Sequence, residues 1–238
     1  LMRNSLDEFD LAIKFDPNNY KAYDKKGLVL FGIKDFQKAK EMFEKTIALK
    51  PDYVQAYVNL GMVYYMIKNS DEAKKTWEKA IALKPEDNDS KAYNNLGNLF
   101  KDAKDYDKAV EYYEKAIKQE NNNSTYLNNL GDIYRLKNDF RKAEEVLQKS
   151  LAADAKGMTT HFNLGKVYKD EKNYDKAIAS FEASVKTNPF YVESYYEMAE
   201  IYLQKNDKKT AKEAIEKALQ KEPGNIKFTE LLAKVQTS

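Results

Sequence analysis

The sequence has no cysteine and a single histidine, His161, among its 238 residues. The absence of cysteine excludes disulfides, thiolate metal ligands and cysteine nucleophiles, and one imidazole leaves little room for histidine chemistry. Glycine-rich phosphate loops, metal-spaced acidic clusters and serine nucleophile motifs are missing as well. These absences predict a chain that is not an enzyme and that holds no cofactor and no metal.

Proline and glycine are also scarce, with five prolines and eight glycines, so the loops must be short and of few kinds. No uncharged apolar run approaches the roughly 20 residues of a bilayer-spanning helix, which argues against membrane insertion. An excess of one charge is absent too, because 40 Lys and Arg residues are balanced by 38 Asp and Glu residues. The two signs alternate along the chain, so no binding surface for nucleic acid is predicted.

The sequence does contain an internal repeat. Three series of residues recur at a spacing of 34 residues; the glycine and alanine series include one step of 36, and two repeats between Pro85 and Pro189 lack the proline. The three are the glycine series Gly27, Gly61, Gly97, Gly131 and Gly165, the alanine series Ala39, Ala73, Ala109, Ala143, Ala177 and Ala211, and the proline series Pro17, Pro51, Pro85, Pro189 and Pro223. The longer step comes from two extra residues within 85–89, which predicts a longer loop there.

Each repeat predicts two amphipathic helices of about 14 residues, joined at a polar break such as Lys34-Asp35 or Lys104-Asp105. Proline ends the second helix, because the residue before a proline is pushed out of the α region. A glycine in the middle of the first helix costs about 1 kcal/mol relative to alanine. Its recurrence therefore predicts close packing of the two helices, with the alanine series facing the glycines from the second helix.

Both helices of the unit resemble those of a tetratricopeptide repeat. The stretches AYVNLGMVY (56–64), AYNNLGNLF (92–100) and THFNLGKVY (160–168) resemble its first helix, and DKAVEYYEKAI (107–117) resembles its second. The resemblance covers essentially the whole chain and implies an all-α, right-handed superhelical solenoid of stacked antiparallel helix pairs. In this register the single array consists of a half repeat (1–19), six full repeats (20–53, 54–89, 90–123, 124–157, 158–191 and 192–225) and a capping helix (226–238).

The two ends depart from the repeat. Residues 5–17 read as a second helix without its first helix, so we expect the chain to start inside a repeat of a longer protein. The apolar residues of this helix are Leu6, Phe9, Ile13 and Phe15. Because they form an uncovered face, we expect weak homodimerisation through the N-terminal edge. At the other end, the apolar face of a cap on the sixth repeat is predicted from Ile226, Phe228, Leu231, Leu232 and Val235.

Asparagine recurs on the first helices, which the resemblance places on the concave face of the array. It occupies the sixth position of four consecutive repeats, as Asn59, Asn95, Asn129 and Asn163. An amide both donates and accepts hydrogen bonds, so these residues are predicted to hold the backbone of an extended peptide. The pattern is similar to the asparagine ladder of O-linked N-acetylglucosamine transferases. The alternative is that asparagine here is a tolerated polar residue of the family consensus.

The predicted groove also changes in character along the chain. Its other residues are Met62, Tyr65, Lys91, Asn94, Asn98, Lys101, Asn128, Arg135, Lys166 and Lys169. The first two repeats add Leu28, Phe31 and Val58 to an apolar strip, and the sixth ends the groove with Glu193, Glu197 and Glu200. A ligand with an apolar end, an acidic centre and a basic end would complement this gradient. In the alternative, a segment before residue 1 covers the apolar strip.

One ligand class of the family is excluded by the residues present. Family members that grip the acidic tails of chaperones use a two-carboxylate clamp, which needs three cations. The register from Tyr20 offers Asp24, Leu28, Asn59, Lys91 and Asn95, and the register from Ser90 offers Asn94, Asn98, Asn129, Thr159 and Asn163. Neither register has the full set of cations, so this chain is not predicted to bind chaperone tails by such a clamp.

The remaining unusual residues fit the core of the repeat. His161 replaces a recurring tyrosine, and Trp77 takes the position of Phe43 one repeat earlier. The sequence therefore predicts a non-catalytic scaffold that binds another protein or peptide through its concave groove. Two alternatives stay open: a structural module that assembles with itself, and the substrate-selecting arm of an enzyme whose catalytic domain lies outside these residues.

Overall fold

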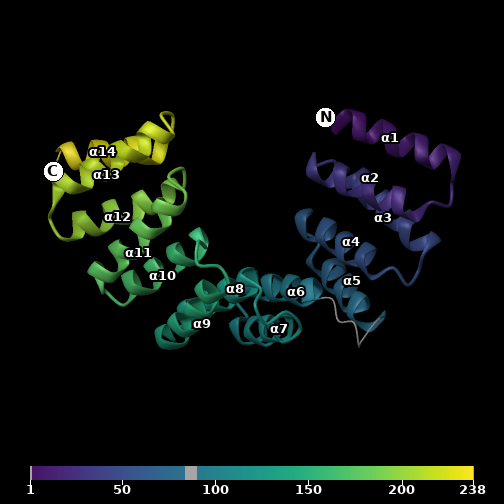
Figure 1. The fold of residues 1–238 in the computed structure, drawn as a ribbon, viewed down its shortest axis with the longest axis horizontal. Coiled ribbons are helices and arrows are strands. Elements are labelled where there is room, and N and C mark those ends of the chain that lie inside the picture. Colours follow the sequence, from purple (N-terminus) through teal and green to yellow (C-terminus); the bar gives the residue numbers. More distant parts are fainter. Residues whose placement is uncertain (1, 84–89, 238) are drawn as a thin grey trace. The chain divides into compact units, whose positions relative to one another are not determined.

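The computed structural model describes residues 2–83 and 90–237, which form helices and short turns (Figure 1). The helices are α1 (Met2–Phe15), α2 (Tyr20–Gly32), α3 (Phe36–Leu49), α4 (Val54–Met66), α5 (Ser70–Leu83), α6 (Ser90–Asp102), α7 (Tyr106–Gln119), α8 (Ser124–Leu136), α9 (Phe140–Ala153), α10 (Met158–Asp170), α11 (Tyr174–Thr187), α12 (Val192–Gln204), α13 (Lys208–Lys221) and α14 (Ile226–Thr237). No strand occurs among the described residues, so the predicted all-α class is confirmed. None of the described helices is long and apolar enough to cross a bilayer. Pro85 and the predicted loop at 85–89 lie outside the described residues.

The chain divides into two compact units, Leu1–Asn121 (unit 1) and Asn122–Ser238 (unit 2). Within unit 1 the helices pack as the pairs α2–α3, α4–α5 and α6–α7, and within unit 2 as α8–α9, α10–α11 and α12–α13 (Figure 1). Each second helix also contacts the first helix of the next pair in its unit. Each unit is therefore a solenoid in which neighbouring pairs stabilise one another.

The same turn joins the two helices of every pair. One residue adopts the left-handed conformation, with φ between 59° and 64°, at Lys34, Lys68, Lys104, Asn138, Lys172 and Asn206. The next residue is an Asp or Asn at each turn. Its side chain caps the second helix, as where Asp105 Oδ1 accepts a hydrogen bond from the Lys108 backbone N–H at 3.3 Å. A left-handed residue followed by an N-cap reverses the chain within three residues, at the predicted polar break.

The repeated glycines allow a large side chain of the second helix to lie against the first helix. A Cβ added to Gly61 would stand 2.4 Å from Nε1 of Trp77, and one added to Gly97 would stand 2.6 Å from the ring of Tyr113. The same holds for Gly27 with Phe43, Gly131 with Leu147 and Gly165 with Phe181. The alanine series is fully buried in the second helices. The predicted close packing is therefore present, but the group over each glycine is a large side chain rather than an alanine.

The two terminal helices pack through part of the faces predicted for them. In α14, Phe228, Leu231 and Val235 are buried in a cluster with α12 and α13, whereas Ile226 is 72% exposed and does not belong to that face. In α1, Leu6 packs on the core of α2–α4. Phe15 is 82% exposed, so it lies apart from the half-buried Phe9 and Ile13. Its exposed apolar neighbour one turn away is Leu11, at 53%.

Candidate functional site

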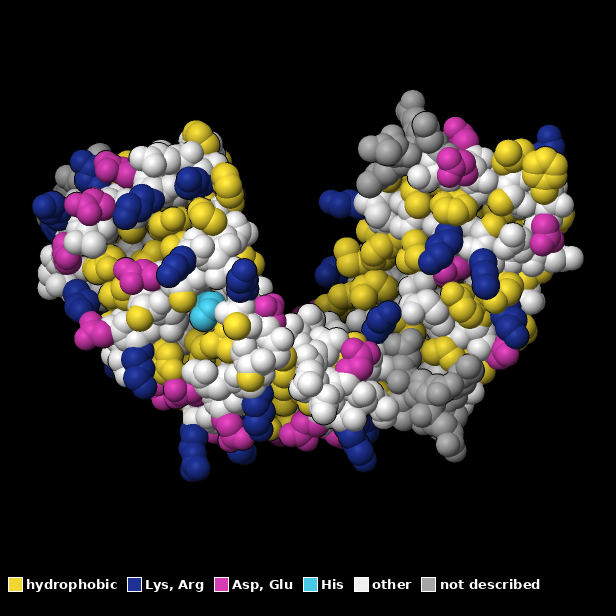
Figure 2. Space-filling model, in the orientation of Figure 1, with side chains coloured by type: hydrophobic (Ala, Val, Ile, Leu, Met, Phe, Trp, Pro, Cys, Tyr) yellow, Lys and Arg dark blue, Asp and Glu magenta, His cyan; other side chains and the backbone are white. Residues whose placement is uncertain are grey.

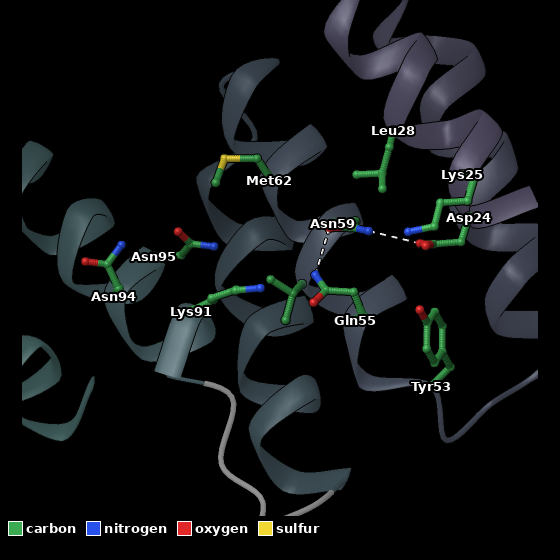
Figure 3. Close-up of a pocket in the computed structure, with 11 residues that line it drawn as sticks. Asp24, Lys25, Leu28, Tyr53, Gln55, Asn59, Met62, Lys91, Asn94 and Asn95 are labelled. Carbon is green, nitrogen blue, oxygen red and sulfur yellow. Dashed lines mark hydrogen bonds between the residues drawn. The ribbon is translucent and has the colours of Figure 1, made fainter. Parts of the chain in front are cut away.

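A pocket of about 560 Å³ lies in unit 1, where the first helices α2, α4 and α6 adjoin (Figure 3). Its lining residues are Asp24, Lys25, Leu28, Tyr53, Gln55, Val58, Asn59, Met62, Lys91, Asn94 and Asn95. Seven of the predicted groove residues thus line one pocket: Leu28, Val58, Asn59, Met62, Lys91, Asn94 and Asn95. The pocket has the volume of ordinary ligand sites.

A chain of hydrogen bonds forms part of the pocket wall. Asn59 Nδ2 donates to Asp24 Oδ1 at 3.0 Å, and Gln55 Nε2 donates to Asn59 Oδ1 at 2.9 Å (Figure 3). Asp24 is only 1% exposed. Burial raises the pKa of its carboxyl above the ordinary value, although the hydrogen bond from Asn59 and the charge of Lys25 act in the opposite direction. The amide of Asn59 is therefore held in a fixed orientation by its neighbours.

Sequence reasoning assigned neither Asp24 nor Gln55 to the binding site. Asp24 occupies a helix position that holds Val58 in the next repeat and Phe162 later in the chain. A carboxylate at a position that is otherwise often apolar is the signal that could have identified it. Gln55 gives a weaker signal, because it stands one turn before Asn59 on the same helix, at the spacing of neighbouring side chains.

Two of the predicted groove asparagines join helices instead. Asn128 is 8% exposed, and its Nδ2 donates to Thr160 Oγ1 at 2.9 Å and to Ser150 Oγ at 3.3 Å. Asn98 Oδ1 accepts a hydrogen bond of 2.7 Å from the hydroxyl of Tyr113 on the paired second helix. The polar groups of these two amides thus hold neighbouring helices together, and their part in the groove stays a prediction.

The asparagines of unit 2 that share the register of Asn59 and Asn95 resemble Asn59 in burial and are more exposed than Asn95. Asn129 on α8 and Asn163 on α10 are half-buried. Asn163 Nδ2 donates to Asn128 Oδ1 at 3.4 Å. Asn95 on α6, in contrast, is 6% exposed, although it still lines the pocket of unit 1. The four members of the predicted ladder thus differ in their surroundings.

The predicted cations of unit 2 are neutralised within the chain. Arg135 lies 2.9 Å from Asp132 and 2.7 Å from Asp170. Lys166 lies 3.4 Å from the same Asp132 carboxylate. The charges of Arg135 and Lys166 are thus offset by carboxylates of α8 and α10, and their part in a cationic groove centre stays a prediction.

Lys169 forms two short ion pairs within unit 2. Its Nζ lies 2.5 Å from Glu197 and 2.6 Å from Glu200, both on α12. Burial alone would lower the pKa of Lys169, but the hydrogen bonds to the two glutamates outweigh it and raise the pKa above the ordinary value. The acidic end predicted for the groove thus serves, in part, as the partner of a lysine from the preceding repeat.

Tyr65 and Lys101 lie outside the pocket of unit 1. Tyr65 lines a separate depression of about 360 Å³ beside Phe100, and its hydroxyl donates to Asp102. Burial and this hydrogen bond raise the pKa of Tyr65 to about 12, so the hydroxyl stays protonated. Lys101 is half-buried on α6. Neither residue is brought together with the asparagines.

The two residues assigned to the core differ in burial. Trp77 is fully buried, and its Nε1 donates to the Val58 carbonyl at 3.1 Å, which confirms the prediction. His161 is half-buried. No group of three or more His, Asp or Glu side chains in the described residues could hold a metal ion. Both signs of charge are intermixed on the face seen in Figure 2.

Comparisons with known proteins give one family. Models of the tetratricopeptide repeat match residues 20–53, 52–119, 92–156 and 168–235. A sequence comparison with curated proteins finds no match.

Solved structures with the same fold share about a fifth of their residues with the chain. The Cut9–Hcn1 hetero-tetramer of the APC/C is similar with a TM-score of 0.79 and 20% identity over 98% of this chain, which spans 46% of that chain. PilF of Pseudomonas aeruginosa gives a TM-score of 0.73 at 19% identity, over 90% of this chain and 97% of its own. YrrB, described as a TPR protein with an unusual peptide-binding site, gives 0.57 at 19% identity, over 79% and 96%.

Proposed function

Because this chain belongs to the tetratricopeptide repeat family, whose repeats indicate a scaffold for protein–protein interaction, we propose that it binds an extended segment of another protein along its first helices. The chain itself carries out no chemistry in this proposal. The observation that carries it is the pocket of unit 1, which three successive first helices line with amides, apolar side chains and two lysines.

The amide of Asn59 suits a peptide backbone even though it is already hydrogen-bonded. A carboxamide has two N–H donors and two acceptor lone pairs, and the bonds to Asp24 and Gln55 use one of each. One donor and one acceptor stay available, which is the pair that a peptide unit requires. Because the side chain of Asn59 is already fixed before binding, it loses less conformational entropy when the peptide binds. The peptide-binding site named for the structurally similar YrrB supports the same use of the fold.

Affinity of the bound segment for amide variants tests this function. Partner proteins captured by the full chain are scanned as overlapping peptides, and the binding peptide is titrated by fluorescence anisotropy. Each lost amide should cost about 1 kcal/mol. Replacing Asn59 and Asn95, which line the pocket of unit 1, by alanine together should therefore weaken binding by about 2 kcal/mol, roughly thirtyfold.

Two controls accompany that titration. Circular dichroism must show a folded variant, because Asn59 also bonds within the chain. Alanine at Gln119 and Gln220, which are exposed on the second helices α7 and α13, should leave the affinity unchanged. Equal binding by the wild type and the folded asparagine variant would overturn the proposal.

A second candidate function, self-association, is favoured by one observation. Leu11 and Phe15 are exposed on α1, one helical turn apart. Later second helices place lysine at the position of Leu11, as in Lys45 and Lys79. Exposed apolar pairs of this kind mark surfaces that associate.

A further inference from the structure

One wall of the pocket in unit 1 is apolar and accessible. Leu28 of α2 is 39% exposed, and Met62 of α4 is half-buried beside the buried Val58. Figure 2 shows hydrophobic side chains at the surface over α2 and α4. An aliphatic side chain placed against Leu28 and Met62 would remove apolar surface from water on both partners, which favours binding.

The rim of the same pocket is cationic. Lys25 of α2 and Lys91 of α6 are both exposed, and Asn59 lies between them (Figure 3). Among the described residues that line the pocket, Asp24 is acidic, and it is buried and accepts the hydrogen bond from Asn59. Two exposed ammonium groups on either side of a polar wall favour a ligand that carries carboxylates.

Unit 2 differs at the equivalent helix positions. Leu28 and Met62 correspond there to Asp132 and Lys166, which pair with each other at 3.4 Å. Lys91 corresponds to Glu193, so the cation is replaced by an anion. The combination of an apolar wall with two rim lysines therefore belongs to unit 1, and unit 2 has no counterpart to it at these positions.

We infer that the pocket of unit 1 binds an internal, extended segment of the partner protein in which an aliphatic residue stands between acidic residues. The aliphatic side chain lies against Leu28 and Met62, and the carboxylates reach Lys25 and Lys91. The backbone meets the remaining donor and acceptor of Asn59. A terminal carboxylate is not required, because Asp24 and Asn95 occupy positions where a chaperone-tail clamp would need cations. This inference rests on the proposed function and names its ligand class.

Synthetic peptides test the ligand class with the full chain. The probe is a dye-labelled nine-residue peptide with blocked ends, one central Leu and a Glu on each side, measured by fluorescence anisotropy at low salt. Each exposed ion pair contributes about 1.4-fold to fivefold to the affinity. Changing both Glu residues to Gln should therefore weaken binding about tenfold, as should Leu to Ser. Raising the ionic strength should weaken the Glu peptide and leave the Gln peptide nearly unchanged.

Variants of the protein provide the matched comparison. Lys25→Glu with Lys91→Glu should weaken the Glu peptide at least tenfold. Lys45→Glu with Lys118→Glu changes the same charge on exposed positions of the second helices α3 and α7, and should alter the affinity less than twofold. All four positions are exposed, so circular dichroism should show unchanged folding.

The outcomes separate this inference from the function on which it rests. Equal binding of the Glu and Gln peptides, no binding of the Glu peptide, or an unaffected Lys25/Lys91 variant would overturn the acidic–aliphatic class. A free terminal carboxylate that is required for binding would overturn the internal segment. If the natural partner segment still depends on the asparagines in any of these cases, the proposed function stands; if it does not, both fall.

Discussion

Replacing Gly61 by alanine should destabilise unit 1, because the new methyl group has no room. Its Cβ would lie 2.4 Å from Nε1, 2.6 Å from Cδ1 and 2.8 Å from Cε2 of Trp77. These are three atoms of one rigid ring that is fully buried. The indole must therefore move as a whole, and it cannot keep its hydrogen bond to the Val58 carbonyl in the present geometry.

The size of the effect follows from three contributions. Overpacking of a well-packed core costs about 1–3 kcal/mol, and loss of the indole hydrogen bond costs about 1 kcal/mol. The better helix propensity of alanine returns up to about 1 kcal/mol. The free energy of unfolding should therefore fall by about 1–3 kcal/mol.

Urea unfolding followed by tryptophan fluorescence measures this directly, because Trp77 is the single tryptophan of the chain and reports on its own surroundings. The matched control is Gly32→Ala, since a Cβ at Gly32 has no atom within 4 Å. That variant should be as stable as the wild type or slightly more stable. Equal stability of Gly61→Ala and the wild type, or an equal loss in Gly32→Ala, would refute the packing argument.

Three further changes have expected outcomes. Lys104→Gly should raise the free energy of unfolding by about 0.5–1 kcal/mol, because Lys104 has a φ of 59° that glycine adopts at lower cost. Asn138→Gly should raise the free energy of unfolding less, because asparagine tolerates the left-handed conformation better than lysine. A loss of stability in Lys104→Gly would contradict the argument. Burial raises the pKa of Asp24 above its ordinary value of 3.8, so folding disfavours the ionised carboxylate. The free energy of unfolding should therefore fall as the pH rises from 3.8 through the raised pKa. Urea unfolding between about pH 4 and 7 should show that Asp24→Asn removes this part of the pH dependence, and an unchanged pH dependence would contradict the argument. Leu11→Lys with Phe15→Lys should abolish weak self-association in sedimentation velocity, and a wild type that stays monomeric at high concentration would sink the second candidate function.

The helix pairs could be predicted because each repeat carries its own signals and packs on its neighbours. Gly61 is 16 residues from Trp77, and the same spacing recurs from Gly27 to Phe43, so close packing was readable as a pattern. The side chain that lies over each glycine could not be predicted. Periodicity identifies the buried face of the second helix, but it does not say which buried residue of that face, such as Ala73 or Trp77, contacts the glycine.

The surface could be predicted less well, since its state depends on side chains about one repeat apart. Asn59 bonds to Asp24, 35 residues away, and Lys169 to Glu197, 28 residues away. Whether such groups face a ligand or each other is decided by rotamers and helix spacing, which hydrophobic periodicity does not encode. The chemistry of single residues therefore did not reveal the ion pairs that Arg135, Lys166 and Lys169 form within unit 2.

Site-specific photo-cross-linking tests the central claim, that the partner lies on the first helices of unit 1. A benzophenone amino acid replaces Leu28 on α2 in one variant and Lys45 on α3 in the other, both at exposed positions, and cross-linked peptides are identified by mass spectrometry. Leu28 should cross-link to one short contiguous segment of the partner, and Lys45 should not. Cross-links from Lys45 without any from Leu28 would place the partner on the second helices and contradict the account.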